Sequence, residues 1–185
     1  MSKLTIDGID VVGKRVLVRV DFNVPLDADG GVLDDRRIRM AIPTLRSVLD
    51  RGGSLVLMSH LGRPAGTGFE PAYSLKPVAD RLAELLPGVP VTLASEDCIG
   101  PNADRAVGGL EPGGIVLLEN LRFHAAEKKN DPEFAAKLAA HGDVYVNDAF
   151  GTAHRAHASM VGVPEAMQDR HRVAGRLLEA ELAFL

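Results

Sequence analysis

In Leu17-Val18-Arg19-Val20-Asp21-Phe22-Asn23, a short apolar run typical of a β-strand ends at polar side chains. If several such runs are parallel strands of one sheet, their carboxyl ends form a single edge, where open α/β sheets bind their ligands. Because Arg and His follow most of these runs, we expect the ligand to be an anion. The pattern recurs in Leu55-Val56-Leu57-Met58 before Ser59-His60-Leu61-Gly62-Arg63, in Ile115-Val116-Leu117-Leu118 before Glu119-Asn120-Leu121-Arg122-Phe123-His124, and in Val144-Tyr145-Val146 before Asn147-Asp148-Ala149-Phe150-Gly151-Thr152-Ala153-His154-Arg155-Ala156-His157.

Segments with apolar residues at helical spacing alternate with these runs. This alternation predicts an α/β fold: a three-layer αβα sandwich with a mostly parallel, Rossmann-like sheet and helices on both faces. A turn cluster at residues 27–31 predicts a hairpin or an excursion within residues 11–33. A helix is expected from Asp34 or Asp35 to Gly52-Gly53, kinked or delayed by Pro43, and a second helix is expected to be capped by Ser74. A strand is expected over 89–93, where Pro90 favours a sheet edge. Two further helices are expected, one near 101–108 and one beginning at Asp131-Pro132.

Composition bounds the class of protein. The chain has 185 residues, enough for one domain with a substantial core, and its 46% hydrophobic and 25% charged residues are ordinary for a soluble globular protein. The net charge of −4 argues against a surface devoted to nucleic acid, so any anion site must be local. No apolar run approaches 18 residues, and the first residues lack a signal-like apolar core. We therefore expect a cytoplasmic protein that binds neither membrane nor nucleic acid.

Four arginines are candidates for holding the anion: Arg37, Arg63, Arg122 and Arg155. The guanidinium group offers paired donors and keeps its charge, which suits phosphate and carboxylate groups. A hydrogen bond to a charged group contributes about 1.5–3 kcal/mol net, so three or four convergent arginines could bind a small anion firmly. The alternative for each is an ordinary solvated surface arginine.

His60, His154 and His157 add neutral or cationic donors near physiological pH. They could instead bond to nearby loop carbonyls, and His154 and His157, three residues apart, could share a metal ion. No HExxH motif and no Glu accompanies them, so we expect no metal site.

Other residues and motifs give weaker indications of function. Asp21 and Asn23 directly follow a strand and could bond to a substrate hydroxyl or carboxylate, or could simply close the strand with an Asx turn. The single cysteine, Cys98, lies in an acidic setting and is expected to be inert. The chain has neither a GxxxxGK[ST] nor a GxGxxG motif, so it lacks both standard phosphate loops for nucleotides.

Five motifs taken together resemble the amino-terminal domain of phosphoglycerate kinases, in the family's order and over essentially the whole chain. The family transfers a phosphoryl group between 1,3-bisphosphoglycerate and ADP, giving 3-phosphoglycerate and ATP, with magnesium, in glycolysis. The motifs are Val18-Arg-Val-Asp-Phe-Asn-Val-Pro25, Arg37-Ile-Arg, Ser59-His-Leu-Gly-Arg-Pro64, Glu119-Asn-Leu-Arg-Phe-His124 and Asn147-Asp-Ala-Phe-Gly-Thr-Ala-His-Arg-Ala-His157.

The resemblance implies a role for each site residue. Asp21 and Asn23, flanking Phe22, would contact the glycerate, and Arg37 would be the catalytic residue aimed at the migrating phosphoryl group. The remaining substrate-binding residues would be His60, the Leu61-Gly62 amides, Arg63, Arg122, His154 and Arg155.

The resemblance also implies that residues 1–173 bind the acid substrate and that residues 174–185 begin a helix connecting to a second domain. That domain would carry ADP or ATP with its magnesium ion, so we expect no nucleotide or metal site in this chain. We expect a monomer that binds 3-phosphoglycerate or 1,3-bisphosphoglycerate but does not complete the reaction alone.

Two other readings of the same residues stay open. One is a stand-alone phosphate-binding or anion-binding module without catalysis. The other is a metal-assisted hydrolase that uses Asp21, Asp148 and the histidines.

Overall fold

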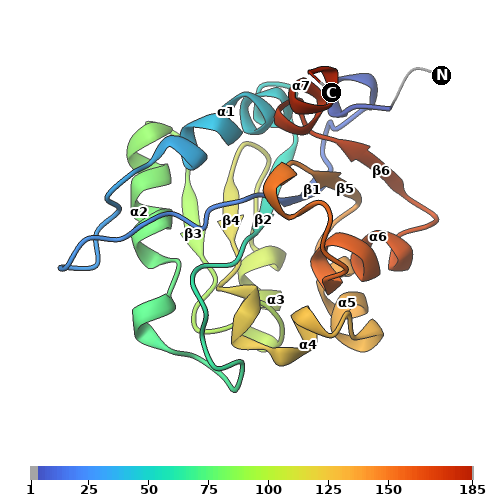
Figure 1. Cartoon of the computed structure of the whole chain (residues 1–185). Coiled ribbons are helices and arrows are strands. Elements are labelled where there is room, and N and C mark those ends of the chain that lie inside the picture. Colours follow the sequence, from blue (N-terminus) through green and yellow to red (C-terminus); the bar gives the residue numbers. More distant parts are fainter. Residues whose placement is uncertain (1–3, 185) are drawn as a thin grey trace.

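The protein is built on one six-stranded sheet (Figure 1). The computed structural model describes residues 4–184. All strand pairs are parallel, and the strand order is β3-β4-β2-β1-β5-β6. This confirms the predicted parallel α/β sheet. The strands are β1 (Arg15–Arg19), β2 (Ser54–Met58), β3 (Val91–Leu93), β4 (Ile115–Leu117), β5 (Val144–Asn147) and β6 (His171–Ala174).

Helices cover both faces of the sheet, as predicted (Figure 1). One face is covered by α1 (Arg36–Leu49) and α2 (Lys76–Leu85), and α7 (Arg176–Ala183) lies against α1. The opposite face is covered by α3 (Pro101–Gly108), α5 (Pro132–Ala139) and α6 (Val163–Ala166), with the short α4 (Ala125–Lys128) and a π-helix (Ala158–Gly162) beside them. No helix in residues 4–184 is long and apolar enough to cross a membrane.

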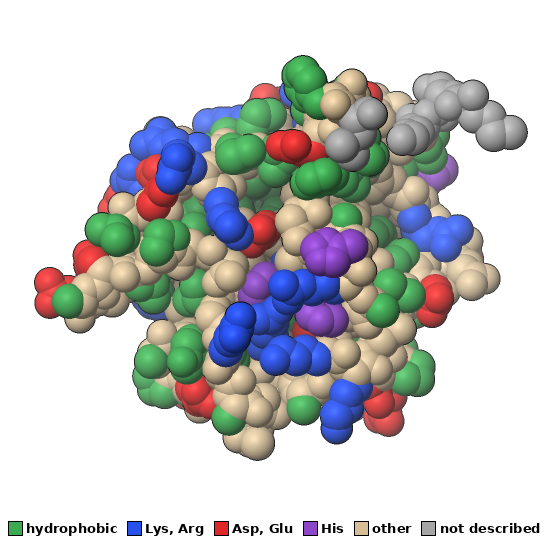
Figure 2. All heavy atoms as spheres, viewed as in Figure 1, with side chains coloured by type: hydrophobic (Ala, Val, Ile, Leu, Met, Phe, Trp, Pro, Cys, Tyr) green, Lys and Arg blue, Asp and Glu red, His purple; other side chains and the backbone are tan. Residues whose placement is uncertain are grey.

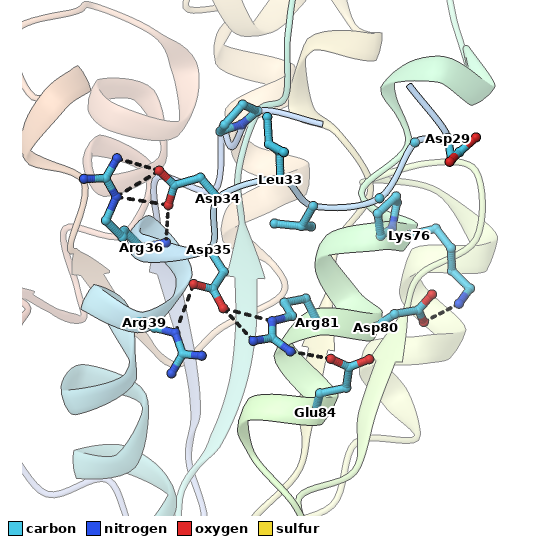
Figure 3. A pocket seen from close by; sticks show the side chains of 15 residues that line it. Asp29, Leu33, Asp34, Asp35, Arg36, Arg39, Lys76, Asp80, Arg81 and Glu84 are labelled. Carbon is cyan, nitrogen blue, oxygen red and sulfur yellow. Dashed lines mark hydrogen bonds and ion pairs between the residues drawn. The ribbon is translucent and has the colours of Figure 1, made fainter. Parts of the chain in front are cut away.

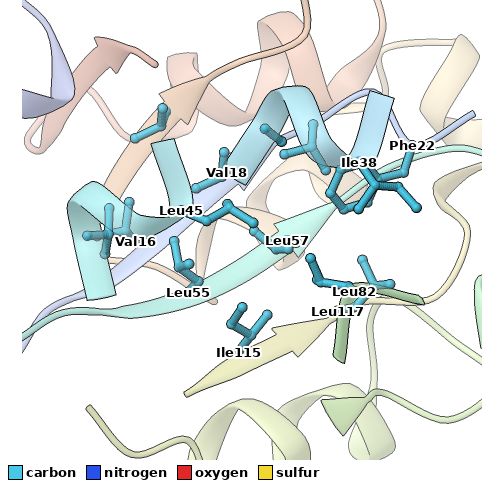
Figure 4. Close-up of a cluster of buried hydrophobic side chains, with 14 of the residues drawn as sticks. Val16, Val18, Phe22, Ile38, Leu45, Leu55, Leu57, Leu82, Ile115 and Leu117 are labelled. Atoms are coloured by element: carbon cyan, nitrogen blue, oxygen red, sulfur yellow. The ribbon is translucent and has the colours of Figure 1, made fainter. Parts of the chain in front are cut away.

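The four inner strands β1, β2, β4 and β5 are buried on both sides, so successive residues enter different cores. Val16 and Val18 of β1 face the core under α1 and α2, where Leu55 and Leu57 of β2 join them (Figure 4). Leu17 of β1 enters the opposite core, beneath α3, α5 and α6. This period of two explains why the strands read as continuous apolar runs, a pattern typical of parallel sheets.

Several local expectations are refined by the structure. Pro43 lies inside α1, which runs without interruption from residue 36 to residue 49. Leu75 rather than Ser74 is the N-cap residue of α2, although the Ser74 hydroxyl accepts from the Lys76 N–H at 3.2 Å. The β3 strand that follows Pro90 is an edge strand, as expected. An antiparallel bridge between Leu26 and Val32 confirms the hairpin.

The patterns described above did not predict β6. In this edge strand His171 and Arg172 are exposed, and Val173 is the residue that enters the core. One buried residue gives no alternating signal, because the period of two needs several members before it can be recognised. The strand is defined by its pairing with β5 instead.

The topology places a switch point at β1. From β1 the chain builds β2, β3 and β4 on one side and then returns to place β5 on the other. In doubly wound sheets the ligand crevice lies outside the carboxyl ends of the strands at such a point. The carboxyl ends of β1, β2, β4 and β5 therefore mark the place to look for a site.

Gly142 lies where the packing against β1 leaves no room for a side chain. A Cβ atom there would lie 2.5 Å from the Cβ of Leu17 and 3.2 Å from its backbone nitrogen. Because overpacking of this kind costs about 1–3 kcal/mol, Gly142→Ala is expected to lower the free energy of unfolding by that amount in urea titrations followed by circular dichroism. Gly108→Ala, where a Cβ meets nothing within 4 Å, is the matched control and should not destabilise the chain. Equal stability of the two variants would contradict the packing argument.

Candidate anion-binding site

The segments that leave four strands lie side by side at the switch point. The Leu121 N–H donates to the Ser59 carbonyl at 3.1 Å, and the Asp148 N–H donates to the Arg19 carbonyl at 2.9 Å. These backbone bonds tie the end of β4 to that of β2, and the end of β5 to that of β1. The predicted single edge therefore exists.

Cationic side chains gather at this edge. Figure 2 shows Lys or Arg and His side chains together at the centre of one face. The pKa of Arg122 is lowered by burial and by the positive charges of Arg155, Arg19 and Arg63. We call Arg63, Arg122, Arg155, His60 and His157 the basic patch. Like charges held this close repel one another, which is the electrostatic condition for binding an anion.

Arg122 is positioned by the backbone around it. Its own N–H donates to the Asn120 side-chain oxygen at 3.0 Å, and its Nη1 donates to the Gly62 carbonyl at 3.1 Å. Its Nε is buried and has no hydrogen-bond partner within residues 4–184. A buried guanidinium N–H without an acceptor is costly, and an anionic ligand would satisfy it.

His60 can be assigned a single tautomer. Its Nδ1 lies 2.9 Å from Nη2 of Arg19, and a guanidinium group only donates, so Nδ1 must accept and the proton must sit on Nε2. Burial, and then the charges of Arg19 and Arg122, lower the pKa of His60 to about 2. Of the two expected forms of His60, neutral or cationic, this lowered pKa and the contact with Arg19 favour the neutral ring.

Arg19 is a site residue that the sequence reasoning missed. It is fully buried at the end of β1, where Nε donates to the Ser159 hydroxyl at 2.9 Å and Nη1 donates to the Val20 carbonyl. Burial lowers its pKa, and the negative charge of Glu127 opposes that shift. The available signal was a lone arginine inside an apolar strand, because Arg is almost never fully buried without a partner.

The loop after β2 is held by side-chain amides. The Gly62 N–H donates to the Asn23 side-chain oxygen at 2.9 Å, and Asn120 bonds to both the N–H and the carbonyl of Leu61. Gly62 has a φ of +61°, and a Cβ there would meet the Tyr73 ring at 2.6 Å. Only glycine fits without strain.

These contacts change the expected roles of three residues. The side chains of Phe22 and Leu61 are buried in the core under α1 and α2, so they support the site from below. The Leu61 and Gly62 amides lie beside the basic patch, as the resemblance implies, but both already donate within the protein. They shape the loop rather than provide free donors.

Arg37 stands apart from the other arginines. Its Nη1 forms an ion pair with Asp21 at 2.7 Å, and about half of its side chain is exposed. The side chains of Arg37 and Asp21 line a small, mostly apolar pocket together with Met40, Phe150 and Leu177. Of the four predicted arginines, three share the basic patch and Arg37 faces a neighbouring pocket.

The loop after β5 carries His154, Arg155 and His157. His154 and Arg155 are exposed, and within residues 4–184 the structure shows no hydrogen bond from either side chain. Burial, with the charges of Arg122 and Arg155, lowers the pKa of His157. Arg155 and His157 thus belong electrostatically to the patch, whereas among the described residues no hydrogen bond or pKa shift links His154 to it.

The described residues offer few candidate ligands for a metal ion. Both Leu177 and Leu178 N–H groups donate to one oxygen of Asp148, at 3.0 and 3.3 Å, so this oxygen holds the start of α7. The other oxygen of Asp148 is buried and has no hydrogen-bond partner within residues 4–184. Within residues 4–184, three candidate metal ligands meet only at Asp97, Cys98 and His124. Burial raises the pKa of the Cys98 thiol well above its usual range, and Asp97 and His124 bond to each other at 2.6 Å. A buried thiol with a raised pKa carries little thiolate, which favours the expected unreactive cysteine.

A wide crevice between the hairpin, α1 and α2 is a second surface feature (Figure 3). Asp35 accepts from Arg39 at 3.0 Å and from Arg81 at 2.7 and 2.9 Å, and Lys76 pairs with Asp80. The charged side chains that line the crevice neutralise one another, so the crevice has no excess positive charge with which to bind an anion.

Comparison with known proteins agrees with the motifs and the geometry. Residues 6–185 match the family model described as phosphoglycerate kinase. The chain belongs to the phosphoglycerate kinase family. It is 56% identical over its full length to phosphoglycerate kinases of Chlorobaculum tepidum and Rhodopirellula baltica, covering 45% and 46% of those proteins.

The solved structures give the same relationship. The chain is similar to phosphoglycerate kinase from Coxiella burnetii, with a TM-score of 0.84 and 36% identity, covering 97% of this chain and 43% of that one. For the enzyme from Pyrococcus horikoshii the TM-score is 0.82 and the identity 32%, covering 97% and 44%. The chain therefore spans less than half the length of these family members.

The protonation state of His60 is directly measurable. Long-range ¹H–¹⁵N NMR spectra, with the resonance assigned through His60→Gln, should show a neutral ring with its proton on Nε2 from pH 7 down to about pH 4. Because the unfolded state takes up a proton near pH 6.5 and the folded state does not, His60 also reduces stability as the pH falls below about 6.5. Titration of the folded ring near pH 6.5 would contradict the assignment.

Proposed function

We propose that these residues are the acid-substrate half of a phosphoglycerate kinase, binding 3-phosphoglycerate or 1,3-bisphosphoglycerate at the basic patch. The observation that carries the proposal is the convergence of Arg63, Arg122 and Arg155 beside a buried Arg122 Nε with no partner in residues 4–184. The family assignment supplies the reaction, reversible phosphoryl transfer with ADP and ATP in glycolysis.

Each group of the substrate has a suitable partner. The phosphate is a multivalent anion with three acceptor oxygens, which matches several guanidinium groups and the neutral Nε2–H donor of His60. Asp21 and Asn23, at the neighbouring end of β1, would contact the glycerate. The Asn23 oxygen already accepts from Gly62, so its remaining amide hydrogens are the donors for the substrate.

Arg37 would act on the migrating phosphoryl group. Phosphoryl transfer spreads charge over the equatorial oxygens, and a positioned arginine stabilises that charge. In this structure Arg37 is paired with Asp21, so this ion pair must open or turn for the guanidinium to reach the phosphoryl group. The Arg37 side chain is about half exposed, although Asp21 is mostly buried, and ion pairs with an exposed partner contribute only about 0–1 kcal/mol.

The nucleotide and its magnesium ion do not fit the described residues. The patch is cationic, Asp21 pairs with Arg37, and Asp148 is buried with one oxygen bonded to the start of α7. We propose that magnesium and ADP or ATP bind to the part of the family's length that this chain does not span. Residues 1–173 are then the acid-substrate unit, and residues 174–185 lead toward the remainder.

A stand-alone anion-binding module would use the same patch. The family assignment favours the kinase, and so does Arg37, which lies outside the patch that a simple binder needs. In a coupled assay we expect no ATP formation from the 185-residue chain alone, since the residues described offer no nucleotide site. Normal turnover by this chain would overturn the proposed division of labour.

Binding of 3-phosphoglycerate tests the patch itself. Arg122→Ala is expected to weaken binding roughly 10- to 100-fold in isothermal titration calorimetry, because one charge-assisted contact contributes about 1.5–3 kcal/mol. Arg36→Ala, which removes an exposed arginine paired with Asp34, is the control and should bind normally. Equal effects of the two substitutions would place the substrate elsewhere.

Arg37→Ala separates binding from transfer. In the whole protein that contains this chain, the variant should fold and bind 3-phosphoglycerate almost normally, while kcat falls on the order of a thousandfold, as for other arginines that contact the transferring phosphoryl group. Steady-state kinetics alongside calorimetry make the distinction. Loss of 3-phosphoglycerate binding with an unchanged kcat would reassign Arg37 to substrate anchoring.

A further inference from the structure

A continuous chain of buried polar groups runs beneath the basic patch. It links Glu127 of α4, Ser159 of the π-helix, Arg19 of β1 and His60 after β2, each between 0% and 4% exposed. Both Ser159 groups donate to Glu127, the hydroxyl to Oε1 at 2.5 Å and the N–H to Oε2 at 3.1 Å. Arg19 then donates to the Ser159 hydroxyl and to His60 Nδ1, each at 2.9 Å.

The direction of every bond in this chain is fixed. A carboxylate only accepts and a guanidinium only donates. The Ser159 oxygen receives a hydrogen from Arg19, so its own hydrogen goes to Glu127. At the other end, His60 Nδ1 receives a hydrogen from Arg19, so the ring carries its proton on Nε2. Glu127 and His60 are thus the two ends of one polarised chain.

Glu127 also supplies the largest compensating negative charge for Arg19. Arg19 is buried beside the cations of the patch, and a buried charge without compensation is costly. Asp21 and the Tyr145 hydroxyl are the other groups that favour the charged Arg19, and Tyr145 donates to the Ser159 carbonyl at 2.8 Å. Of the two carboxylates, Glu127 is the fully buried one and is committed to Ser159.

We propose that Glu127 is a positioning residue of the anion site, acting through Ser159 and Arg19 to keep His60 as an Nε2–H donor. The inference rests on the proposed function, because the donor serves the acid substrate. With the proton on Nε2, the ring offers a hydrogen to an anion. With the proton on Nδ1 instead, Nε2 would present a lone pair to the anion and repel it. Within residues 4–184 the structure shows no hydrogen bond at Nε2, which leaves this atom for a ligand.

Glu127→Gln is the primary test. The glutamine amide keeps the shape but sets an NH₂ donor against one of the two Ser159 donors and removes the negative charge. In the folded variant we expect ¹H–¹⁵N NMR spectra of His60 to show a population protonated on Nδ1, and calorimetry to show 3-phosphoglycerate binding at least about tenfold weaker. Glu133→Gln, on the exposed surface of α5, is the matched control and should change neither reading.

Ser159→Ala tests whether Glu127 acts on Arg19 and His60 through the Ser159 hydroxyl. It removes the hydroxyl link while keeping the Glu127 carboxylate, so it should shift the His60 tautomer as Glu127→Gln does. It also replaces Glu127→Gln as the deciding variant if that protein fails to fold by circular dichroism. An unchanged His60 tautomer in folded Ser159→Ala would overturn the relay.

The outcomes separate the two proposals. The inference is overturned if folded Glu127→Gln keeps the Nε2–H tautomer and binds within twofold of the parent chain, since Glu127 would then be only structural. It is also overturned if the tautomer shifts and binding does not. If the parent chain shows the Nε2–H tautomer, lost in the variants, and does not bind 3-phosphoglycerate, the proposed function fails while the hydrogen-bond relay stands.

Discussion

The site depends on one buried cation. Arg19 is the last residue of β1, an inner strand of the sheet. Its guanidinium group bonds to the carbonyl of the next residue, Val20, to Ser159 of the π-helix and to His60 in the loop after β2. It therefore fixes the relative positions of segments from β1, β2 and β5 beneath the basic patch. Its positive charge is stable there because Glu127 lies one hydroxyl away and Asp21 lies nearby. A hydrophobic residue at the same position could fill the space, but it could not set the protonation of His60.

Several polar residues of the sequence motifs bond to backbone groups of neighbouring segments. Glu119 accepts from the Ser74 hydroxyl and the Leu75 N–H at the start of α2, Asn120 braces Leu61, and Asp148 receives two amides of α7. Parallel strands end in irregular loops whose backbone groups need partners. A rigid arrangement at that edge therefore needs polar residues that bond to the loops as well as those that would contact a ligand, and this accounts for the length of the motifs.

The sheet and its ligand edge could be predicted because they rest on local patterns. Strand runs such as Leu55–Met58 and helix starts such as Asp131-Pro132 carry their own signals, and Arg122 was found because it follows a strand. Arg19 was missed because burial of a charge depends on partners 41 and 140 residues away. The Arg37–Asp21 pair and the tautomer of His60 were hidden for the same reason, since both depend on tertiary contacts between segments distant in sequence.

The basic patch opposes the stability of the fold that carries it. Burial and mutual repulsion lower the pKa values of Arg122 and His157, and the buried Nε of Arg122 has no acceptor in residues 4–184. A bound anion would remove both penalties at once, since it neutralises charge and accepts the hydrogen bond. Because a ligand that binds only the folded state stabilises it by mass action, occupancy of the patch and stability of the chain must rise together. The repulsion within the patch would thus be the counterpart of the proposed affinity for an anion.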